Sequence, residues 1–376
     1  MTDLNEIREE IDKVDKDMVR LFQERMKLCR EVAEYKIENG KQVLDTAREK
    51  EKIKSIKNLV TDEFEKYGAG DLFKQIMAVS RKLQYQILAK HGMINEVSFE
   101  AVDTIRTKGI RIVYQGVEGA YAHEAVVKYF GEDADCYHVE SWRDAMEEVR
   151  AGRADYAVLP IENSTAGAIT QVHDLLIEYD NYIVAETDIK VEHALLGLSN
   201  ADINNITTVY SHPQALMQCS KYLEEHRQWK QISCPNTAVS AKKVFDEGDT
   251  RQAAIASLQA AKLYGLKVLK EKINYADINT TRFVIVGRER IYTKEADKVS
   301  ICVEIDHKSG SLYNVLSHFI YNEINMTKIE SRPIPDRKWE YRFIMDIEGK
   351  LGDAAVKNAL MGISEEVNKF VILGNY

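Results

Sequence analysis

The stretch DYAVLPIENSTAG, residues 155–167, joins an apolar run directly to a polar turn. The apolar part predicts a buried strand, and four polar side chains follow it: Glu162, Asn163, Ser164 and Thr165. In α/β sheets ligands bind beyond the carboxyl ends of the strands, so polar groups there are typical of a binding site. Such residues can also do no more than cap the next helix. The stretch predicts α/β architecture and leaves both interpretations open.

Strand-loop-helix units recur around this stretch from Ile110 onward. The strands IRIVYQG (110–116) and TTVYSHPQA (207–215) each precede a helical pattern. We expect helices from about residue 120, from about residue 167, and one that ends near residue 225. This alternation predicts parallel α/β layering over residues 110–288.

Residues 1–90 contain no proline and follow a helical period. Apolar residues recur at alternating steps of three and four, which predicts a heptad seam on one long helix: Leu4, Ile7, Ile11, Val14, Met18, Leu21, Leu28, Val32 and Tyr35. A helix of about 32 residues is roughly 48 Å long. Further helices, expected around 45–60 and 70–90, are too short to cover that seam, so we expect a dimer.

Arg25 interrupts the seam. An unpaired charge there is costly, so Arg25 should face an anion, either a structural carboxylate or a bound ligand. Lys36 lies roughly 16 Å further along the helix, so both side chains can reach one small anion from opposite ends. Arg8 lies roughly 42 Å from Lys36 and can join such a site only from a partner chain. The alternative for Arg8 is that its charged end extends to water.

The last segment, residues 298–376, has a different order of elements. Its expected strands and helices are VSICVEI (299–305), SLYNVLSHFIYN (311–322), NMTKIES (325–331), WEYRFIMDIE (339–348), a helix over about 353–367, and FVILG (370–374). The order βαββαβ is the ferredoxin-like arrangement. Residues 91–109 show no sustained pattern and are interpreted as a linker.

Composition narrows the class of protein. A chain of 376 residues is too long for one ordinary core, and its net charge of −9 argues against a general nucleic-acid binder. The five cysteines are scattered, without a CxxC pair or a Cys/His cluster, so neither disulfides nor a zinc site is expected. The charged start and the lack of a long apolar run argue against a signal peptide and a membrane span. We expect a cytoplasmic protein without metal or cofactor.

The polar pattern of residues 1–90 resembles the all-helical chorismate mutase family. The motifs LDTAREKE (44–51) and VSRKLQ (79–84) carry the resemblance, together with three cations of the long helix. The matching positions are Arg8, Arg25, Lys36, Asp45, Arg48, Glu49, Ser80 and Gln84. The resemblance implies an intertwined dimer in which Arg8 of one chain completes the site of the other.

The same resemblance implies a role for each position. Arg8, Arg25 and Arg48 would hold the carboxylates of chorismate; Lys36 and Gln84 would donate to its ether oxygen; Asp45, Glu49 and Ser80 would serve the ring hydroxyl and orient neighbours. The rearrangement to prephenate involves one molecule and needs no nucleophile, only a compressed conformer and donors where negative charge develops. A dimerising bundle without activity is the alternative.

The middle segment resembles prephenate dehydratase over about residues 110–288. The resemblance is carried by YQGVEGAYAHEA (114–125), GRADYAVLPIENSTAG (152–167), VYSHPQALMQC (209–219), NTAVSA (236–241), AAIAS (253–257) and NTTRFVIVG (279–287). It implies two α/β lobes with the substrate in the cleft between them. The implied cleft residues are Asn163, Ser164, Thr165, Thr281, Arg282 and Phe283, with Thr281 at the chemistry.

The chemistry implied for this cleft needs neither a metal nor a covalent nucleophile. Prephenate loses carbon dioxide and its ring hydroxyl in one elimination, and aromatisation of the ring supplies the driving force. Neutral donors suit that task, and we assign Thr281 as the donor to the leaving hydroxyl. One departure is Ala122 after Tyr121, where many relatives carry Ser or Thr, so a hydroxyl contact is expected to be missing or replaced. His123, His173 and His212 lie near expected loops and are more often structural.

The terminal segment resembles the ACT-type regulatory domain of prephenate dehydratases. The resemblance implies phenylalanine binding by a glycine-containing loop and an ESRP motif, that is, by Ser309, Gly310, Ser311 and Leu312 and by Glu330, Ser331, Arg332 and Pro333. Glycine at 310 allows close backbone approach, and Glu330 can meet an ammonium group.

These resemblances together imply a bifunctional chorismate mutase/prephenate dehydratase that phenylalanine inhibits, working as a homodimer or larger oligomer. Two alternatives stay open. One is an enzyme that prefers arogenate, and the other is a catalytically inactive amino-acid sensor built from the same modules.

Overall fold

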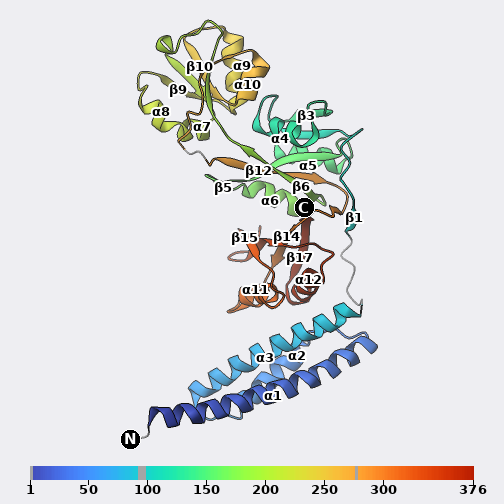
Figure 1. Cartoon of the computed structure of the whole chain (residues 1–376). Coiled ribbons are helices and arrows are strands. Elements are labelled where there is room, and N and C mark those ends of the chain that lie inside the picture. Colours follow the sequence, from blue (N-terminus) through green and yellow to red (C-terminus); the bar gives the residue numbers. More distant parts are fainter. Residues whose placement is uncertain (1–2, 92–98, 276–277) are drawn as a thin grey trace. The chain divides into compact units, whose positions relative to one another are not determined.

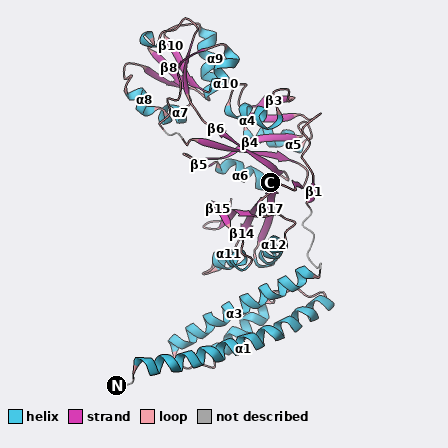
Figure 2. Cartoon of the chain, in the orientation of Figure 1, coloured by secondary structure: helices cyan, strands magenta, loops and turns pink. Residues whose placement is uncertain are grey.

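The computed structural model describes residues 3–91, 99–275 and 278–376 (Figure 1). The chain forms two compact units. Unit 1 combines Met1–Ser98 with Lys298–Ile372, and unit 2 combines Phe99–Asp297 with Leu373–Tyr376. Figure 2 shows helices throughout the described N-terminal segment, whereas strands and helices alternate further along the chain.

The N-terminal part of unit 1 consists of α1 (Leu4–Glu38), α2 (Thr46–Lys57) and α3 (Glu63–Lys90). Each helix starts at an aspartate that accepts a hydrogen bond from a backbone N–H of the first turn: Asp3, Asp45 and Asp62. Such caps satisfy donors that have no partner inside the helix. The long first helix is therefore confirmed. The third helix begins earlier than the predicted residue 70, because Asp62 caps it there.

The predicted seam of α1 is exposed in the single chain. Its apolar side chains include Leu4, Leu21 and Leu28, which are 57%, 54% and 57% exposed. The packing of α3 against α1 therefore leaves this face of α1 uncovered within the described chain. An apolar stripe of this length is typical of an interaction surface.

The C-terminal part of unit 1 has the elements β14 (Lys298–Glu304), α11 (Ser311–Tyr321), β15 (Met326–Pro333), β16 (Tyr341–Glu348), α12 (Ala354–Glu366) and β17 (Lys369–Asn375). Strand β16 pairs antiparallel with both β14 and β15. Helices α11 and α12 pack against each other, and α12 also contacts α3 of the N-terminal part. The last residues of β17 belong to unit 2, where Gly374 pairs with Ile183.

The first lobe of unit 2 is built on a sheet with the order β6-β12-β4-β2-β3. Its strands are β2 (Ile112–Gln115), β3 (Cys136–Val139), β4 (Tyr156–Asn163), β6 (Tyr182–Lys190) and β12 (Thr280–Gly287), and the short β5 (Gly167–Ala168) pairs with β4. The helices of this lobe are α4 (Tyr121–Phe130), α5 (Trp142–Arg150) and α6 (Thr170–Glu178). Ile112, Val158 and Ile285 are completely buried in its core.

The second lobe is built on a sheet with the order β11-β7-β10-β8-β9. Its strands are β7 (Ala194–Gly197), β8 (Thr208–Ser211), β9 (Lys230–Ser233), β10 (Gln252–Ala256) and β11 (Lys267–Lys270). Its helices are α7 (Pro213–Gln218), α8 (Ser220–Glu224), α9 (Thr237–Glu247) and α10 (Leu258–Tyr264), with a 3-10 turn at Ile203–Asn205. The chain enters this lobe between β6 and β7 and returns between β11 and β12.

The predicted parallel layering is only partly correct, because both sheets are mixed. Strands β2, β3 and β4 are parallel neighbours, as are β8, β9 and β10, but β12 runs antiparallel to β4 and β6, and β7 runs antiparallel to β10 and β11. The exceptions are strands that enter or leave a lobe without an intervening helix. A βαβ connection makes neighbouring strands parallel, and these crossings lack one.

Three smaller expectations also need correction. The helix expected to end near Glu225 is split into α7 and α8 at Cys219. The helix expected from about Gly167 starts at Thr170, after β5. Within the expected linker, residues 92–98 lie outside the described residues, and β1 (Glu100–Val102) pairs in parallel with β13 (Ile291–Thr293).

Candidate functional site

A polar cluster lies between α1 and α3 in the helical module. The guanidinium of Arg25 donates to the hydroxyl of Ser80, and both residues are turned inward, with Ser80 4% exposed. Gln84 is one helical turn further along α3 and is 6% exposed. The structure therefore brings Arg25, Ser80 and Gln84 together, although 55 residues separate the first two in sequence.

The amide of Gln84 is incompletely bonded. Its Nε2 donates to the carbonyl of Ser80 over 3.3 Å, and its buried Oε1 has no hydrogen-bond partner in the part of the chain that the structure describes. A buried polar atom without a partner is uncommon in folded proteins. The amide is thus available to a ligand that enters the cluster.

Lys36 lies near the same region but at the end of α1. Its ammonium donates to the carbonyl of Val43 over 2.6 Å. Burial lowers the pKa of Lys36, although the carboxylates of Asp45 and Glu365 act in the opposite direction. A lysine in this setting is a poorly solvated donor, which suits a bond to a developing negative charge.

The other predicted chorismate residues are more exposed. Asp45 caps α2 by accepting from the backbone N–H of Arg48, and the side chain of Arg48 pairs with Glu51 at 3.3 Å. Arg8 is exposed near the start of α1. Among the described residues, no hydrogen bond or ion pair joins Arg8 or Arg48 to Arg25.

Arg81 was missed by the sequence analysis, although its partner Glu49 was named there. Arg81 is 9% exposed and binds Glu49 as well as Glu366 of α12, the latter with 2.8 Å between Nε and Oε1. Glu366 also lies 3.3 Å from the imidazole of His318. Next to Arg81, the ammonium of Lys82 donates to Ser317 over 2.8 Å, and burial lowers the pKa of Lys82 to about 8. Polar contacts thus join the helical module to the C-terminal module around Glu49.

In unit 2, Asn163 at the end of β4 bonds directly to Thr281 on β12. Its Nδ2 donates to Thr281 Oγ1 over 2.8 Å and to Asn279 Oδ1 over 2.9 Å. Its Oδ1 accepts from the backbone N–H groups of Thr165 and Ala166, each at 3.0 Å. Because two backbone donors fix this oxygen, the amide nitrogen must face Thr281. The oxygen of Thr281 accepts, so its hydroxyl hydrogen is left for another acceptor.

Ser164 and Thr165 have different roles in this cluster. Ser164 ties the end of β4 to the start of β12: its hydroxyl donates to Ile278 O over 2.7 Å and accepts from Thr280 N over 3.0 Å. Thr165 donates to Asn163 Oδ1 over 2.7 Å and accepts from Gln218 of the second lobe over 3.1 Å. Ser164 therefore shapes the turn, and Thr165 connects the lobes.

Arg282 and Phe283 are not brought together with Thr281. Successive side chains of a strand point to opposite faces, and Arg282 is surrounded by Glu186, Glu162 and Asp188 at 3.5, 3.5 and 3.7 Å. Phe283 is 2% exposed and belongs to the core of the first lobe. The structure thus gives both residues partners other than the Thr281 cluster.

His193 and Gln218 were also missed as site residues. His193 lies between β6 and β7, is 2% exposed, and contacts Gln218 Oε1 through Nε2 and Tyr121 Oη through Nδ1, both at 3.0 Å. Gln218 lies within the motif VYSHPQALMQC (209–219), but nothing in its spacing marks it. The position of His193 between two strands, β6 and β7, could have marked it as a candidate site residue.

The three histidines singled out in the sequence bond to nearby backbone. His123 accepts from Gly119 N over 3.2 Å and stacks on Tyr114. His212 caps α7 by accepting from Gln214 N, and the ring of His173 contacts Ile169 O at 3.3 Å. These contacts favour structural roles. Ala122 is 8% exposed and packs in the core of the first lobe, beside Tyr121.

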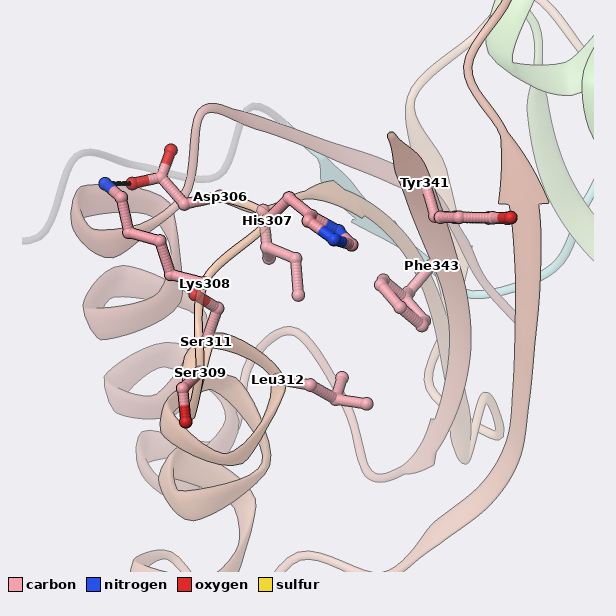
Figure 3. A pocket seen from close by; sticks show the side chains of 9 residues that line it. Asp306, His307, Lys308, Ser309, Ser311, Leu312, Tyr341 and Phe343 are labelled. Atoms are coloured by element: carbon pink, nitrogen blue, oxygen red, sulfur yellow. Dashed lines mark hydrogen bonds and ion pairs between the residues drawn. The ribbon is translucent and has the colours of Figure 1, made fainter. Parts of the chain in front are cut away.

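The C-terminal module contains a pocket of about 440 Å³ before and around the start of α11 (Figure 3). Its lining combines apolar and polar side chains: Ile305, Asp306, His307, Lys308, Ser309, Ser311, Leu312, Tyr341 and Phe343. Gly310 lies in this loop with φ +82°, a conformation that favours glycine. The predicted loop therefore lines a cavity of ligand size. The predicted ESRP motif, residues 330–333, lies on β15 and is not part of this lining.

Comparison with known proteins covers the whole chain. The family model for chorismate mutase type II matches residues 7–85, and the model for prephenate dehydratase matches residues 112–291. A bifunctional chorismate mutase/prephenate dehydratase from Stutzerimonas stutzeri is 32% identical over 99% of this chain and 97% of its own length. This chain belongs to the bifunctional chorismate mutase/prephenate dehydratase family.

Two solved structures each match 71% of this chain. A prephenate dehydratase from Arthrobacter aurescens, solved in complex with L-Phe, has a TM-score of 0.66 and 29% identity, covering 71% of this chain and 90% of its own. A protein described as a novel type of quorum quenching acylase, GqqA, has a TM-score of 0.65 and 29% identity, covering 71% and 97%.

No described helix is both long and apolar enough to cross a membrane. Among the residues described, no group of three or more His, Cys, Asp or Glu side chains is arranged to hold a metal ion.

Proposed function

We propose that this chain rearranges chorismate to prephenate in residues 1–90 and converts prephenate to phenylpyruvate in residues 110–288, and that residues 298–376 bind phenylalanine as a feedback inhibitor. Residues 91–109 connect the first two domains. One observation carries the proposal furthest: each of the two segments matched by a family model contains a polar cluster suited to that reaction.

The mutase reaction requires donors rather than a nucleophile. Arg25 and Arg48, with Arg8 of a partner chain, hold the two carboxylates and select the compressed conformer of chorismate. Gln84 and Lys36 donate to the ether oxygen as its bond breaks. Gln84 Nε2 has a second hydrogen besides the one it donates to the Ser80 carbonyl, and this hydrogen and the poorly solvated ammonium of Lys36 support the assignment. Ser80 orients Arg25, and Glu49 serves the ring hydroxyl of chorismate. Asp45 caps the start of α2.

The mutase domain works as an intertwined homodimer in this proposal. The exposed seam of α1 supplies the interface, and the length of the helix makes Arg8 useful only to the partner's site. Leu21→Glu, in the middle of the seam, should abolish mutase activity, because a dimer would bury the two glutamates of its chains against each other. Turnover of supplied prephenate should stay intact.

The matched control for the seam is Lys16→Glu, an exposed position of α1 outside it. Light scattering after size-exclusion chromatography gives the mass of each variant, and chorismate turnover gives its mutase activity. A Leu21→Glu variant with unchanged mass and full mutase activity would refute the interface.

The dehydratase reaction is an elimination. The bond from the ring to its carboxylate breaks, that electron pair enters the ring, and the hydroxyl on the opposite ring carbon leaves with a proton as water. Thr281 donates a hydrogen bond to the departing hydroxyl, supported by the bond that its own oxygen accepts from Asn163. A threonine hydroxyl is a poor acid, so the proton of the product water comes from solvent or the substrate's surroundings.

The C-terminal module is a ferredoxin-like, ACT-type regulatory domain in this proposal, and its element order supports that assignment. Phenylalanine would occupy the pocket at Ser309–Leu312, with its ring beside Leu312 and Phe343. Feedback requires that the domain bind phenylalanine more tightly in a low-activity arrangement of the enzyme. The ESRP motif, from Glu330 to Pro333, lies on β15 outside the lining of this pocket, so the assignment of Glu330 to the ammonium group rests on the resemblance alone.

Glu330→Ala should remove inhibition by phenylalanine while leaving both activities near wild type. The expected result is a rise of at least tenfold in the phenylalanine concentration that halves prephenate turnover, since a charge-assisted bond is worth about 1.5–3 kcal/mol. Glu348→Ala, an exposed carboxylate at the end of β16, serves as control. Full sensitivity to phenylalanine in Glu330→Ala would leave the pocket loop as the binding element without the ESRP motif.

A direct test of the dehydratase assignment compares prephenate and arogenate at equal concentrations. We expect higher kcat/KM with prephenate. A preference for arogenate would replace the proposed substrate by its transaminated form, and no turnover of either would favour an amino-acid-sensing protein.

A further inference from the structure

His193 occupies the place where the chain crosses from the first lobe of unit 2 to the second. Residues 191–193 connect β6 to β7, and the backbone N–H of Val191 donates to the carbonyl of Asn279, just before β12, over 2.8 Å. The backbone N–H of His193 donates to Asn274 Oδ1 over 3.1 Å, and its carbonyl accepts from Ile273 over 3.0 Å. The backbone of His193 is thus fixed between both crossings, and its side chain is 2% exposed.

The side chain of His193 starts a continuous series of hydrogen bonds that ends at Thr281. Its Nε2 lies 3.0 Å from Gln218 Oε1, and Gln218 Nε2 donates to Thr165 over 3.1 Å. Thr165 donates to Asn163 over 2.7 Å, and Asn163 donates to Thr281 over 2.8 Å. The series crosses from the second lobe to the first between Gln218 and Thr165.

The direction of every bond in this series follows from Asn163. Two backbone N–H groups hold Asn163 Oδ1, so the hydroxyl of Thr165 donates to that oxygen and its own oxygen must accept from Gln218 Nε2. The carbonyl of Gln218 then faces His193, which must carry its hydrogen on Nε2. Nδ1 is left as an acceptor, and the hydroxyl of Tyr121 lies 3.0 Å from it and 3.1 Å from the carbonyl of Glu192.

The surroundings of His193 suit a neutral ring. Burial lowers the pKa of His193, although the bond to Gln218 acts in the opposite direction. The neutral tautomer with hydrogen on Nε2 donates to Gln218 and leaves Nδ1 able to accept from Tyr121.

We propose that His193 is a positioning residue for the dehydratase reaction: its Nε2–H fixes the amide of Gln218, which holds Thr165 and the Asn163–Thr281 pair in the arrangement that offers the Thr281 hydroxyl to substrate. This inference rests on the proposed role of Thr281. His193 itself touches no reacting atom and acts through Gln218. Through Gln218 and Thr165, His193 also helps to hold the second lobe against the first.

Removing the Nε2–H frees the amide of Gln218 to rotate by half a turn. Its carbonyl would then face Thr165, whose hydroxyl would donate to Gln218 instead of Asn163. The bond between the lobes would persist in the wrong direction, and Thr165 would no longer support Asn163. We expect a loss in kcat of about ten- to a hundredfold, because small displacements of positioned groups cost up to about a hundredfold.

The test compares three substitutions of His193 in the full chain. His193→Leu removes both ring nitrogens. His193→Gln places an amide nitrogen close to the former Nε2, and His193→Asn places its amide close to the former Nδ1. We expect a low kcat with prephenate for His193→Leu and His193→Asn. For His193→Gln we expect a kcat within about fivefold of wild type. The KM for prephenate should change less than kcat in all three variants.

Two measurements separate positioning from folding. Mutase activity of the same variants shows whether unit 1 is folded, and the thermal unfolding midpoint of the full chain shows whether unit 2, which contains His193, is folded too. Wild-type kcat in folded His193→Leu would overturn the inference, as would equal losses in folded Gln and Asn variants. Thr281→Ala is measured in parallel: an unchanged rate there overturns the role of Thr281, whereas a slow Thr281→Ala with a fast His193→Leu overturns the role of His193.

Discussion

Replacing Arg25 by alanine is expected to lower the kcat/KM for chorismate by about a thousandfold, which corresponds to about 4 kcal/mol. Arg25 is a half-buried cation in an apolar seam, and its guanidinium donates to Ser80. A substrate with two carboxylates supplies the anion that this position lacks. Turnover of supplied prephenate should not change, because Arg25 belongs to unit 1 and the Thr281 cluster to unit 2.

Arg20→Ala is the matched control on the same helix. Arg20 is exposed and pairs with Asp17 and Glu24, so its loss should cost little. Both activities are measured on each purified variant. Mutase activity close to wild type in Arg25→Ala would remove Arg25 from the site and leave it a structural partner of Ser80.

Thr281→Ala is expected to lower kcat with prephenate by about 10²–10³, the usual cost of deleting one donor that faces developing charge. The residue accepts from Asn163, so alanine removes the donor to substrate and also leaves the Asn163 amide without one acceptor. Mutase activity should stay at the wild-type level.

Thr281→Ser restores the hydroxyl and should recover most of the rate, while Thr207→Ala, at an exposed threonine of the same unit, should have no effect. If Thr281→Ala turns over prephenate at the wild-type rate, the hydroxyl is not the donor. A loss that serine does not repair would instead indicate a packing role.

Much of the fold could be predicted because its signals are local. The heptad seam indicates where α1 lies, and an apolar run indicates where β4 lies. The direction of β12 and β7 was missed, because strand direction depends on the connection between lobes, which local pattern does not contain. The short β1 was missed because its partner, β13, is far away in sequence.

The candidate site likewise combines residues that the sequence could indicate with residues that only distant contacts reveal. The sequence placed Asn163 and Thr281 in one cleft by resemblance, and the structure bonds them. Arg282 is the next residue along the strand, so the alternation of side chains could have separated it from Thr281. Three residues were missed: His193, Gln218 and Arg81. Their roles depend on contacts with residues 25 to 285 positions away, which the local sequence does not reveal.

Product analysis with chorismate tests the central claim most directly. Purified protein is incubated with chorismate, with and without phenylalanine, and the products are resolved by chromatography. The account predicts phenylpyruvate, in an amount that falls when phenylalanine is added. Prephenate that accumulates without phenylpyruvate would contradict the dehydratase assignment, and chorismate left intact would contradict the mutase assignment.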